Sequence, residues 1–314
     1  MKTPRSFLKR SIVAPIAAAV LVVTAVAAVN SNNPENMIAT DGAIEVTDGR
    51  HIQTITREMP FVSGSTLTLD SGNGMIVVSG WDKDQLYVSA EKQLERRVGG
   101  VGWILSKLNI PFSSSESVDT YFDQLDVDVR KAANGVEIET IFPKNTTSVN
   151  VSVHYEIKIP RNASLALRTS NGRVEVANID GTVVARSSNG RIEYADITGP
   201  VEARTSNGKI VLSNVNGAVT ASSSNGPIVV EHAGALEASH AISCTTSNGP
   251  IVVKLPGNSQ FDVLASTSNG GVRTDFAVDG ADSPKRKHLD GRVGTGGPRI
   301  ELKTSNGSIG LEAL

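Results

Sequence analysis

The sequence of 314 residues predicts an all-β protein, a parallel β-solenoid or β-helix-like stack of two-strand coils, preceded by an N-terminal signal or anchor helix. Three observations support this fold class: a repeated Ser-Asn-Gly tripeptide, a regular apolar alternation around each copy, and the composition. Aromatic residues make up only 4% of the chain, whereas 29 residues are glycine. Val, Ile, Ser, Thr and Asn recur throughout, and this mixture favours strands and turns over helices.

The tripeptide is the main internal repeat, and repeats of this kind indicate stacked supersecondary units. It begins at Ser170, Ser188, Ser206, Ser224, Ser247, Ser268 and Ser305. The first three intervals are 18 residues, and the next are 23, 21 and 37. We therefore expect coils of 18 residues, with loops inserted between coils at Glu231–His240 and Gly280–Gly297.

Apolar residues recur at fixed distances from each serine. The column five residues before it holds Leu165, Val183, Val201, Val219, Ile242, Val263 and Ile300. The column three residues before it holds Leu167, Ala185, Ala203, Ala221, Cys244, Ala265 and Leu302, and the column four residues after it holds Val174, Ile192, Ile210, Ile228, Ile251, Val272 and Ile309. Intervening positions are mostly polar, so each strand alternates with period 2. This interpretation places Ala203 inside the coil and Thr205 outside it.

Two turns close each predicted coil. Asn-Gly accepts positive φ, which most residues resist, and a second corner falls at Gly181, Gly199 and Gly217. Asn-Gly between alternating apolar residues is also the strongest hairpin signal, so an antiparallel meander is the competing fold. The column of Ala and Cys stays small through five successive units, which favours direct stacking of parallel strands.

The chain divides into four predicted parts. Residues 1–29 carry a basic start and an apolar run, which predicts either a cleaved signal peptide or an uncleaved membrane anchor, and both export the rest. Residues 30–37 are a linker. Residues 38–160 form a degenerate N-terminal β part with a partly helical insertion at 92–124. Residues 161–314 form the regular solenoid. We therefore expect a secreted, periplasmic or membrane-anchored protein, in contact with the membrane only through an uncleaved N-terminus.

The chain resembles the bacterial putative adhesin family, also called domain of unknown function 4097. The resemblance spans roughly residues 40 to 314. It rests on Gly74-Met75-Ile76-Val77-Val78-Ser79-Gly80-Trp81-Asp82, on Tyr155-Glu156-Ile157-Lys158-Ile159-Pro160, and on the Ser-Asn-Gly repeats. It implies an exported or anchored β-solenoid with no established catalytic residues. The adhesin label adds little mechanism, because fold does not fix function.

Motifs for catalysis, metal ions or cofactors do not stand out in the sequence. Cys244 belongs to the small inward column, which indicates a core residue, and we place His232 and His240 in a solvated loop. The net charge of −2 gives no reason to expect nucleic acid. We expect a surface or envelope interaction module that binds an unknown protein, glycan or surface. The alternatives are a structural envelope scaffold and a polysaccharide-active enzyme, whose best acidic group is Asp119, Asp123, Asp126 and Asp128.

A cationic strip is the one binding surface that the repeat predicts. Two residues before successive serines come Arg168, Arg186 and Arg204, and three residues after them come Arg173, Arg191 and Lys209. Stacked coils would place neighbouring cations in each column about 5 Å apart. The strip could bind repeating sulfate, phosphate or carboxylate groups. Alternatively, Glu175, Glu193 and Glu202 neutralise it locally, and it is only a solvated charged face.

Overall fold

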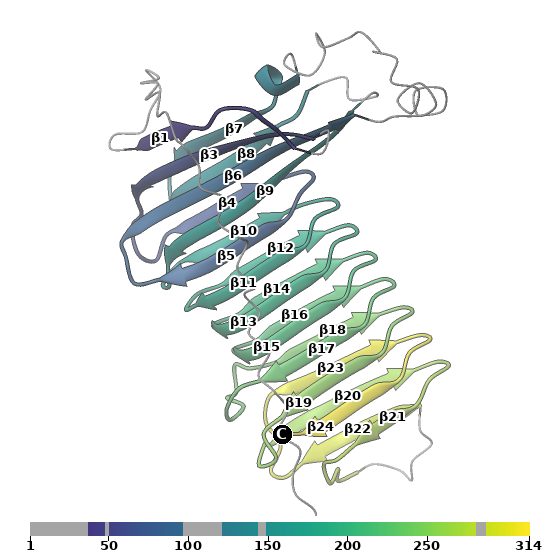
Figure 1. Cartoon of the computed structure of the whole chain (residues 1–314). Helices are drawn as coiled ribbons and strands as arrows, with labels where there is room; N and C mark the ends of the chain where they lie inside the picture. Colours follow the sequence, from purple (N-terminus) through teal and green to yellow (C-terminus); the bar gives the residue numbers. More distant parts are fainter. Residues whose placement is uncertain (1–36, 48–49, 97–120, 144–148, 281–286) are drawn as a thin grey trace, which may run out of the picture.

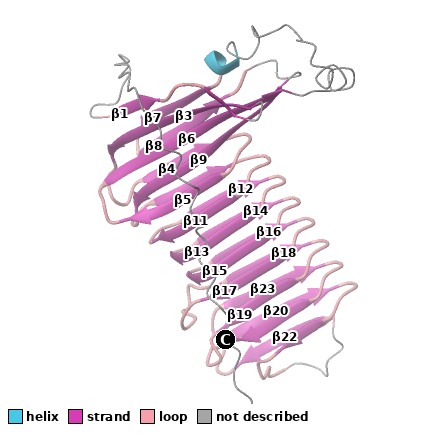
Figure 2. Ribbon diagram, in the orientation of Figure 1, coloured by secondary structure: helices cyan, strands magenta, loops and turns pink. Residues whose placement is uncertain are grey.

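The computed structural model describes residues 37–47, 50–96, 121–143, 149–280 and 287–314. These residues form two long sheets that face each other across one continuous core, as the ladder of arrows in Figure 1 shows. A helical turn at residues 121–124 is the one departure from strands, turns and bends among them (Figure 2). No helix in the described ranges is long and apolar enough to cross a membrane. The predicted signal or anchor segment, and all but the last residue of the predicted linker, lie outside the described residues.

Both sheets are built mainly from parallel strands that lie side by side along the stack. In spatial order, sheet 1 consists of β1 (Ile38–Asp41), β3 (Arg50–Pro60), β6 (Gln85–Arg96), β9 (Val149–Pro160), β5 (Ile76–Trp81), β11 (Val174–Ile179), β13 (Ile192–Thr198), β15 (Ile210–Asn216), β17 (Ile228–His232), β19 (Ile251–Leu255), β24 (Ile309–Ala313) and β21 (Val272–Thr274), with β2 (Glu45–Thr47) paired to β3. In the same way, sheet 2 consists of β22 (His288–Val293), β20 (Phe261–Thr267), β23 (Arg299–Thr304), β18 (Ile242–Thr246), β16 (Val219–Ser223), β14 (Val201–Thr205), β12 (Val183–Ser187), β10 (Ser164–Arg168), β4 (Thr66–Asp70), β8 (Gly135–Ile141) and β7 (Asp126–Ala132).

The repeat region is a parallel solenoid and not a meander. Equivalent residues of successive coils are direct register partners: Ala185 pairs with Ala203, and Ala203 pairs with Ala221. On the other sheet, Ile192 pairs with Ile210 in the same way. The three apolar columns are buried except at Val272, which is half-buried. Each coil therefore buries its apolar face against its neighbours, as the size-matched columns predict.

The last coils do not stack in chain order. β23 lies between β18 and β20, and β24 lies between β19 and β21. The coil that ends the chain is thus inserted into the stack instead of lying at its tip. The segment predicted as a loop at Gly280–Gly297 contains β22, which pairs antiparallel with β20 at the edge of sheet 2. An antiparallel edge strand covers the end of a stack that would otherwise expose parallel strand edges.

The N-terminal part continues the same stack and then changes direction. β4 and β5 extend the two sheets in parallel, and β8 and β9 lie beyond them although they come later in sequence. Antiparallel strands then end both sheets, with β7 at the edge of sheet 2 and β6, β3 and β1 in succession on sheet 1. The predicted insertion at 92–124 begins too early, because β6 runs to Arg96. Residues 97–120 lie outside the described part of the chain.

The glycine of each Ser-Asn-Gly corner is needed for space, and not for the positive φ that we expected. A Cβ at Gly190 would lie 1.6 Å from the carbonyl oxygen of Gly172 in the adjacent coil. Positive φ occurs instead near the ends of β11, β13 and β15, at Asn178, Asp196 and Asn214, with φ of 59°, 57° and 53°, and at Gly199 of the second corner, with φ of 136°. Asn and Asp tolerate this conformation better than other residues with side chains.

The residue before each serine is a buried Ser or Thr, so the outward placement of Thr205 was wrong. Thr205 is 7% exposed, and its hydroxyl donates to the carbonyl of Gly190 in the neighbouring coil at 3.0 Å. The same hydroxyl accepts from the backbone N–H of Gly208 at 3.1 Å. Ser187 and Ser223 make the equivalent pair of hydrogen bonds. This column therefore ties each corner to the coil before it.

Candidate functional site

A ladder of asparagine side chains runs along the Ser-Asn-Gly corners. Each side-chain amide donates to the amide oxygen of the neighbouring asparagine in the stack, at 2.6 to 2.8 Å. In stacking order the ladder is Asn73, Asn171, Asn189, Asn207, Asn225, Asn248, Asn306 and Asn269. The ladder is exposed, so it forms a polar line on the surface between the two columns of the predicted strip.

The first column of the strip lies on the outer face of sheet 2. Arg168 is the register partner of Arg186, which is the register partner of Arg204, and all three are exposed. Within the described part of the chain, two carboxylates contact this column. Glu202 lies between two of the arginines, 2.8 Å from Arg186 and 2.9 Å from Arg204. Asp70 on β4 lies 3.8 Å from Arg168.

The second column lies on the other side of the ladder, where sheet 1 begins. Arg173 contacts Glu175 at 2.5 Å, and Arg191 pairs in the same way with Glu193. The hydrogen bond to Glu175 is the main cause that raises the pKa of Arg173 above its ordinary value. Lys209 has no carboxylate within ion-pair distance among the described residues. In the next coil, proline occupies this position at Pro227.

The structure thus brings the six predicted cations together and also supplies neighbouring acids. Four carboxylates, those of Asp70, Glu175, Glu193 and Glu202, serve five of the six cations. The sequence predicted that the three glutamates would neutralise the strip. It did not predict the contact of Asp70, because this residue comes far earlier in the chain. The strip keeps a small positive excess at exposed side chains, and pairs of this kind contribute only about 0–1 kcal/mol each.

The acidic group proposed for an enzyme does not form a site in the described part of the chain. Asp128 pairs with Arg130 at 2.7 Å, Asp126 accepts from the backbone N–H of Val127, and Asp123 is exposed. Asp119 lies outside the described residues. Within the described ranges, no group of three or more His, Cys, Asp or Glu side chains has an arrangement that could hold a metal ion.

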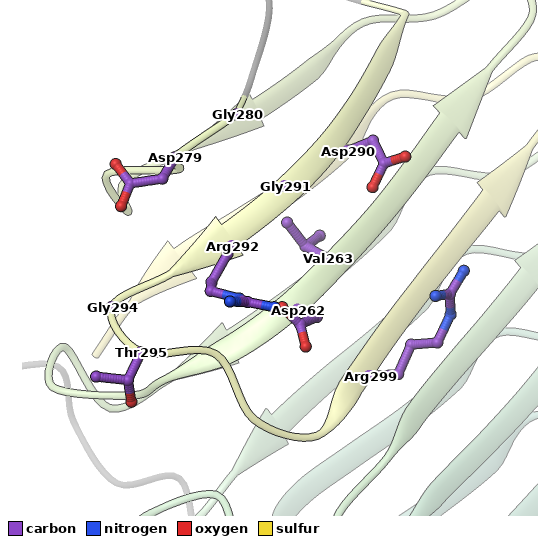
Figure 3. A pocket seen from close by; sticks show the side chains of 10 residues that line it. All are labelled: Asp262, Val263, Asp279, Gly280, Asp290, Gly291, Arg292, Gly294, Thr295 and Arg299. Atoms are coloured by element: carbon purple, nitrogen blue, oxygen red, sulfur yellow. The ribbon is translucent and has the colours of Figure 1, made fainter.

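An open hollow of about 660 Å³ lies at the C-terminal end of the stack. Figure 3 shows Arg292 extended onto Asp262, with Asp279 and Asp290 farther away on either side of Gly291. The Arg292–Asp262 pair is 2.9 Å, and the hydrogen bond is the first cause that raises the pKa of Arg292. Asp262 is therefore held in an ion pair by Arg292.

Two histidines that we placed in a solvated loop are buried side by side. His232 is 0% exposed and His240 is 8% exposed, and their ring centroids are 5.1 Å apart. Neither ring nitrogen of His232 has a hydrogen-bond partner in good geometry within the described structure. Burial and the adjacent His240 lower the pKa of His232, although nearby backbone groups of Gly217 and Gly234 oppose the shift. The period-2 alternation of Ile228, Val230 and His232 could have indicated this inward position, whereas the period of 18 places Ala233 opposite Val215, because it misses the register shift after Leu212.

Cys244 lies in the core, as the repeat predicts. Its side chain is 0% exposed, and burial raises the pKa of its thiol to about 12. The thiolate is the reactive form of cysteine, so Cys244 is not poised as a nucleophile.

Comparison with known proteins gives one family and several distant structures. Residues 198–312 match the family model described as Toastrack DUF4097. Similar solved structures include a putative cell adhesion protein from Clostridium sporogenes ATCC 15579, with 12% identity over 82% of this chain and 99% of that chain and a TM-score of 0.28. A putative adhesin from Bacteroides fragilis NCTC 9343 has 11% identity over 83% and 97%, with a TM-score of 0.32. One from Parabacteroides distasonis ATCC 8503 has 9% identity over 82% and 96%, with a TM-score of 0.34. No curated protein matches the chain.

Proposed function

Since residues 198–312 of the chain belong to the Toastrack DUF4097 family, we propose that the protein is an exported, non-catalytic, adhesin-like module that binds partners through its stacked outer surface. The observation that carries the proposal is the regular column of outward side chains on rigid parallel strands. Strands of this kind repeat about every 4.8 Å, so a residue that recurs in successive coils becomes an evenly spaced array. Such an array suits a repetitive partner better than a small substrate.

Within this proposal, the strip of Arg168, Arg173, Arg186, Arg191, Arg204 and Lys209 binds an anionic polymer or surface. Its exposed guanidinium groups can make bidentate contacts to sulfate, phosphate or carboxylate. The neighbouring acids weaken this attraction, because each must be displaced or shared when the ligand binds. We therefore propose weak, salt-sensitive binding that gains strength from many repeated contacts.

Binding to immobilised heparin, a sulfated polysaccharide, tests the strip. We expect retention of the wild type at low ionic strength and weaker retention when Arg168, Arg186 and Arg204 are replaced by Ser. The control changes three exposed cations outside the strip, Lys83, Lys131 and Arg273, to Ser and should bind like the wild type. If the wild type is not retained, or both triple variants behave alike, the strip is only a solvated charged face.

Export belongs to the same proposal and has a separate test. Replacing Val22 with Arg places a charge in the apolar run of residues 12–29 and should leave the chain in the cytoplasm. Cell fractionation measures the outcome, and export of that variant at the wild-type level would contradict the proposal. N-terminal sequencing of the exported protein separates a cleaved form from an anchored one.

A further inference from the structure

Six outward side chains form one continuous line of charge across sheet 2. From the edge inward, the line consists of Asp128, Glu139, Asp70, Arg168, Arg186 and Arg204, on strands β7, β8, β4, β10, β12 and β14. Each residue is the register partner of the next. Side-chain exposure ranges from 40% at Asp128 to 75% at Arg168, so the line faces solvent. Three acids are therefore followed by three arginines, and we name this set the charged line.

A companion line runs beside it, two residues earlier on the parallel strands. In the same strand order it consists of Arg130, Glu137, Thr68, Ala166, Val184 and Glu202. Its three middle side chains are uncharged and small or medium in size, so they allow another surface to approach closely. Its two ends carry opposite charges, Arg130 at the edge and Glu202 on β14.

We propose that this face of sheet 2 binds a second copy of the chain, in reversed stacking order, about a twofold axis that lies parallel to the strands between β4 and β10. Such an axis reverses the order of the strands in the facing copy. Asp70 then faces Arg168 of the other copy, Glu139 faces Arg186, and Asp128 faces Arg204. In an isologous contact each of these pairs occurs twice.

The companion line fits the same axis. Reversal places Arg130 opposite Glu202, and Thr68 opposite Ala166. Glu137 faces Val184 and is the one charged residue in the two lines without an opposite charge across the axis. The other facing positions in both lines carry only complementary or uncharged pairs, and complementarity of this kind selects one register over others.

Ion pairs within a single copy leave charge at both ends of the face. Arg130 contacts Asp128, Glu137 and Glu139, so three acids share one cation at the β7 end. Among the described residues, Arg186 and Arg204 share Glu202 alone, so two cations share one acid at the β14 end. One end is therefore negative and the other positive. A second copy in reversed order places the negative end against the positive end, whereas a copy in the same order would place like charges together.

The size of the face sets the strength of the contact. Six strands at about 4.8 Å and five residues at about 3.3 Å give a footprint of about 475 Å² on each copy. Stable complexes usually bury about 800 Å² on each partner. The dimer should therefore be weak, should form at high local concentration, and should dissociate as salt screens exposed charges. This inference stands apart from polymer binding, which needs only the arginines, because a second copy needs the acids as well.

Charge reversal with a mixing step tests the proposal. The positive variant changes Asp70, Glu139 and Asp128 to Lys, and the negative variant changes Arg168, Arg186 and Arg204 to Glu. We expect the full-length wild type, in a mild non-ionic detergent, to dimerise in sedimentation experiments at low ionic strength. Each variant alone should associate at least about tenfold more weakly, because like charges then face each other. An equimolar mixture of the two variants should recover association as a heterodimer.

The controls separate this proposal from its competitors. A variant with Arg173, Arg191 and Lys209 changed to Glu carries the same change of charge in the same coils and should dimerise like the wild type. Association through the N-terminal segment would persist in every variant and at high salt. The positive variant keeps all three arginines, so it should lose dimerisation while it still binds heparin.

The proposal is overturned if the wild type stays monomeric at low salt, or if the mixture associates no better than the separate variants. Where a reversed variant does not fold, the neutral variants D70N/E139Q/D128N and R168Q/R186Q/R204Q replace it. Dimerisation of either neutral variant at wild-type strength would equally overturn the proposal.

Discussion

At the scale of single residues, the buried hydroxyl before each Ser-Asn-Gly corner joins one coil to the next. Thr205 satisfies the N–H of Gly208 and the carbonyl of Gly190 at once. Removing a partner from a buried polar group costs more than a hydrogen bond usually contributes, because the group left behind is desolvated without compensation. The column therefore stabilises the stack through its polarity, although it lies among apolar neighbours.

Replacing Thr205 with Val should lower the free energy of unfolding by about 1–3 kcal/mol, because two buried backbone groups lose their partner. The shape of the side chain is nearly kept, so packing changes little. Thr220, which is exposed on β16, is the matched control, and its replacement with Val should change stability by less than about 0.5 kcal/mol. Urea unfolding measures both, and equal effects would show that the hydroxyl of Thr205 does not tie the coils.

His232 should make stability depend on pH. Because the folded state lowers the pKa of His232, the unfolded state binds more protons, and stability rises with pH. This contribution is fully present above the unfolded pKa of about 6.5 and is lost as pH falls through the lower folded value. Thermal melts at neutral and mildly acidic pH should therefore show a loss on acidification that is smaller in a His232→Leu variant. An unchanged pH slope in that variant would contradict the role assigned to His232.

Some buried positions of the coils could be predicted from the sequence, and others could not. Alignment on the serine of each Ser-Asn-Gly identified Ala203 and Cys244 as core residues, because both lie three residues before it in a column of small side chains. Thr205 was placed outward because it is polar, although the alternation through Val201 and Ala203 puts it on the inward face, where the structure has it. The alignment missed the contact of Asp70 with Arg168, because no periodicity links β4 to β10.

At the scale of the element, each coil depends on a corner that only glycine can occupy. The corner chains approach so closely that a methyl group at Gly190 would overlap the backbone of the coil before it. Backbone atoms cannot yield as a flexible side chain would. The sequence signal, Asn-Gly, was therefore right about the position of the turn, whereas the reason lies in stacking distance and not in backbone conformation.

Gly190→Ala should destabilise the protein by more than about 4 kcal/mol, because the clash is with a carbonyl in the adjacent coil and not with a side chain. Gly257→Ala is the control, since the nearest atom to its added Cβ lies 3.9 Å away. Calorimetry compares the two variants. Equal melting temperatures would mean that the coils are spaced more widely than the structure has them.

At the scale of the whole molecule, the arrangement of the stack follows from its ends. A parallel stack of coils exposes unpaired strands at both tips. At one tip this chain adds antiparallel strands to both sheets, β7 to sheet 2 and β6, β3 and β1 to sheet 1. At the other tip it adds antiparallel β22 to sheet 2, whereas sheet 1 ends in β21, which is parallel to β24. The final coil of the chain, β23 and β24, lies between the coil of β18 and β19 and the coil of β20 and β21. Sequence spacing predicts that coils stack, but it does not give their order, because the columns of β20 and β23 are equally apolar and either could pair with β18.

Disulfide formation can report directly whether the last coil of the parallel stack lies between the two coils before it. Thr245 is the register partner of Lys303, whereas Ser266 lies one strand farther away. Adjacent strands lie about 4.8 Å apart, which suits a disulfide, whereas a Cα separation above about 7 Å does not. The buried thiol of Cys244, with its pKa raised to about 12, should not compete. On mild oxidation, T245C/K303C should form a disulfide and T245C/S266C should not. The opposite result would show coils stacked in chain order and would contradict the inserted position of the final coil.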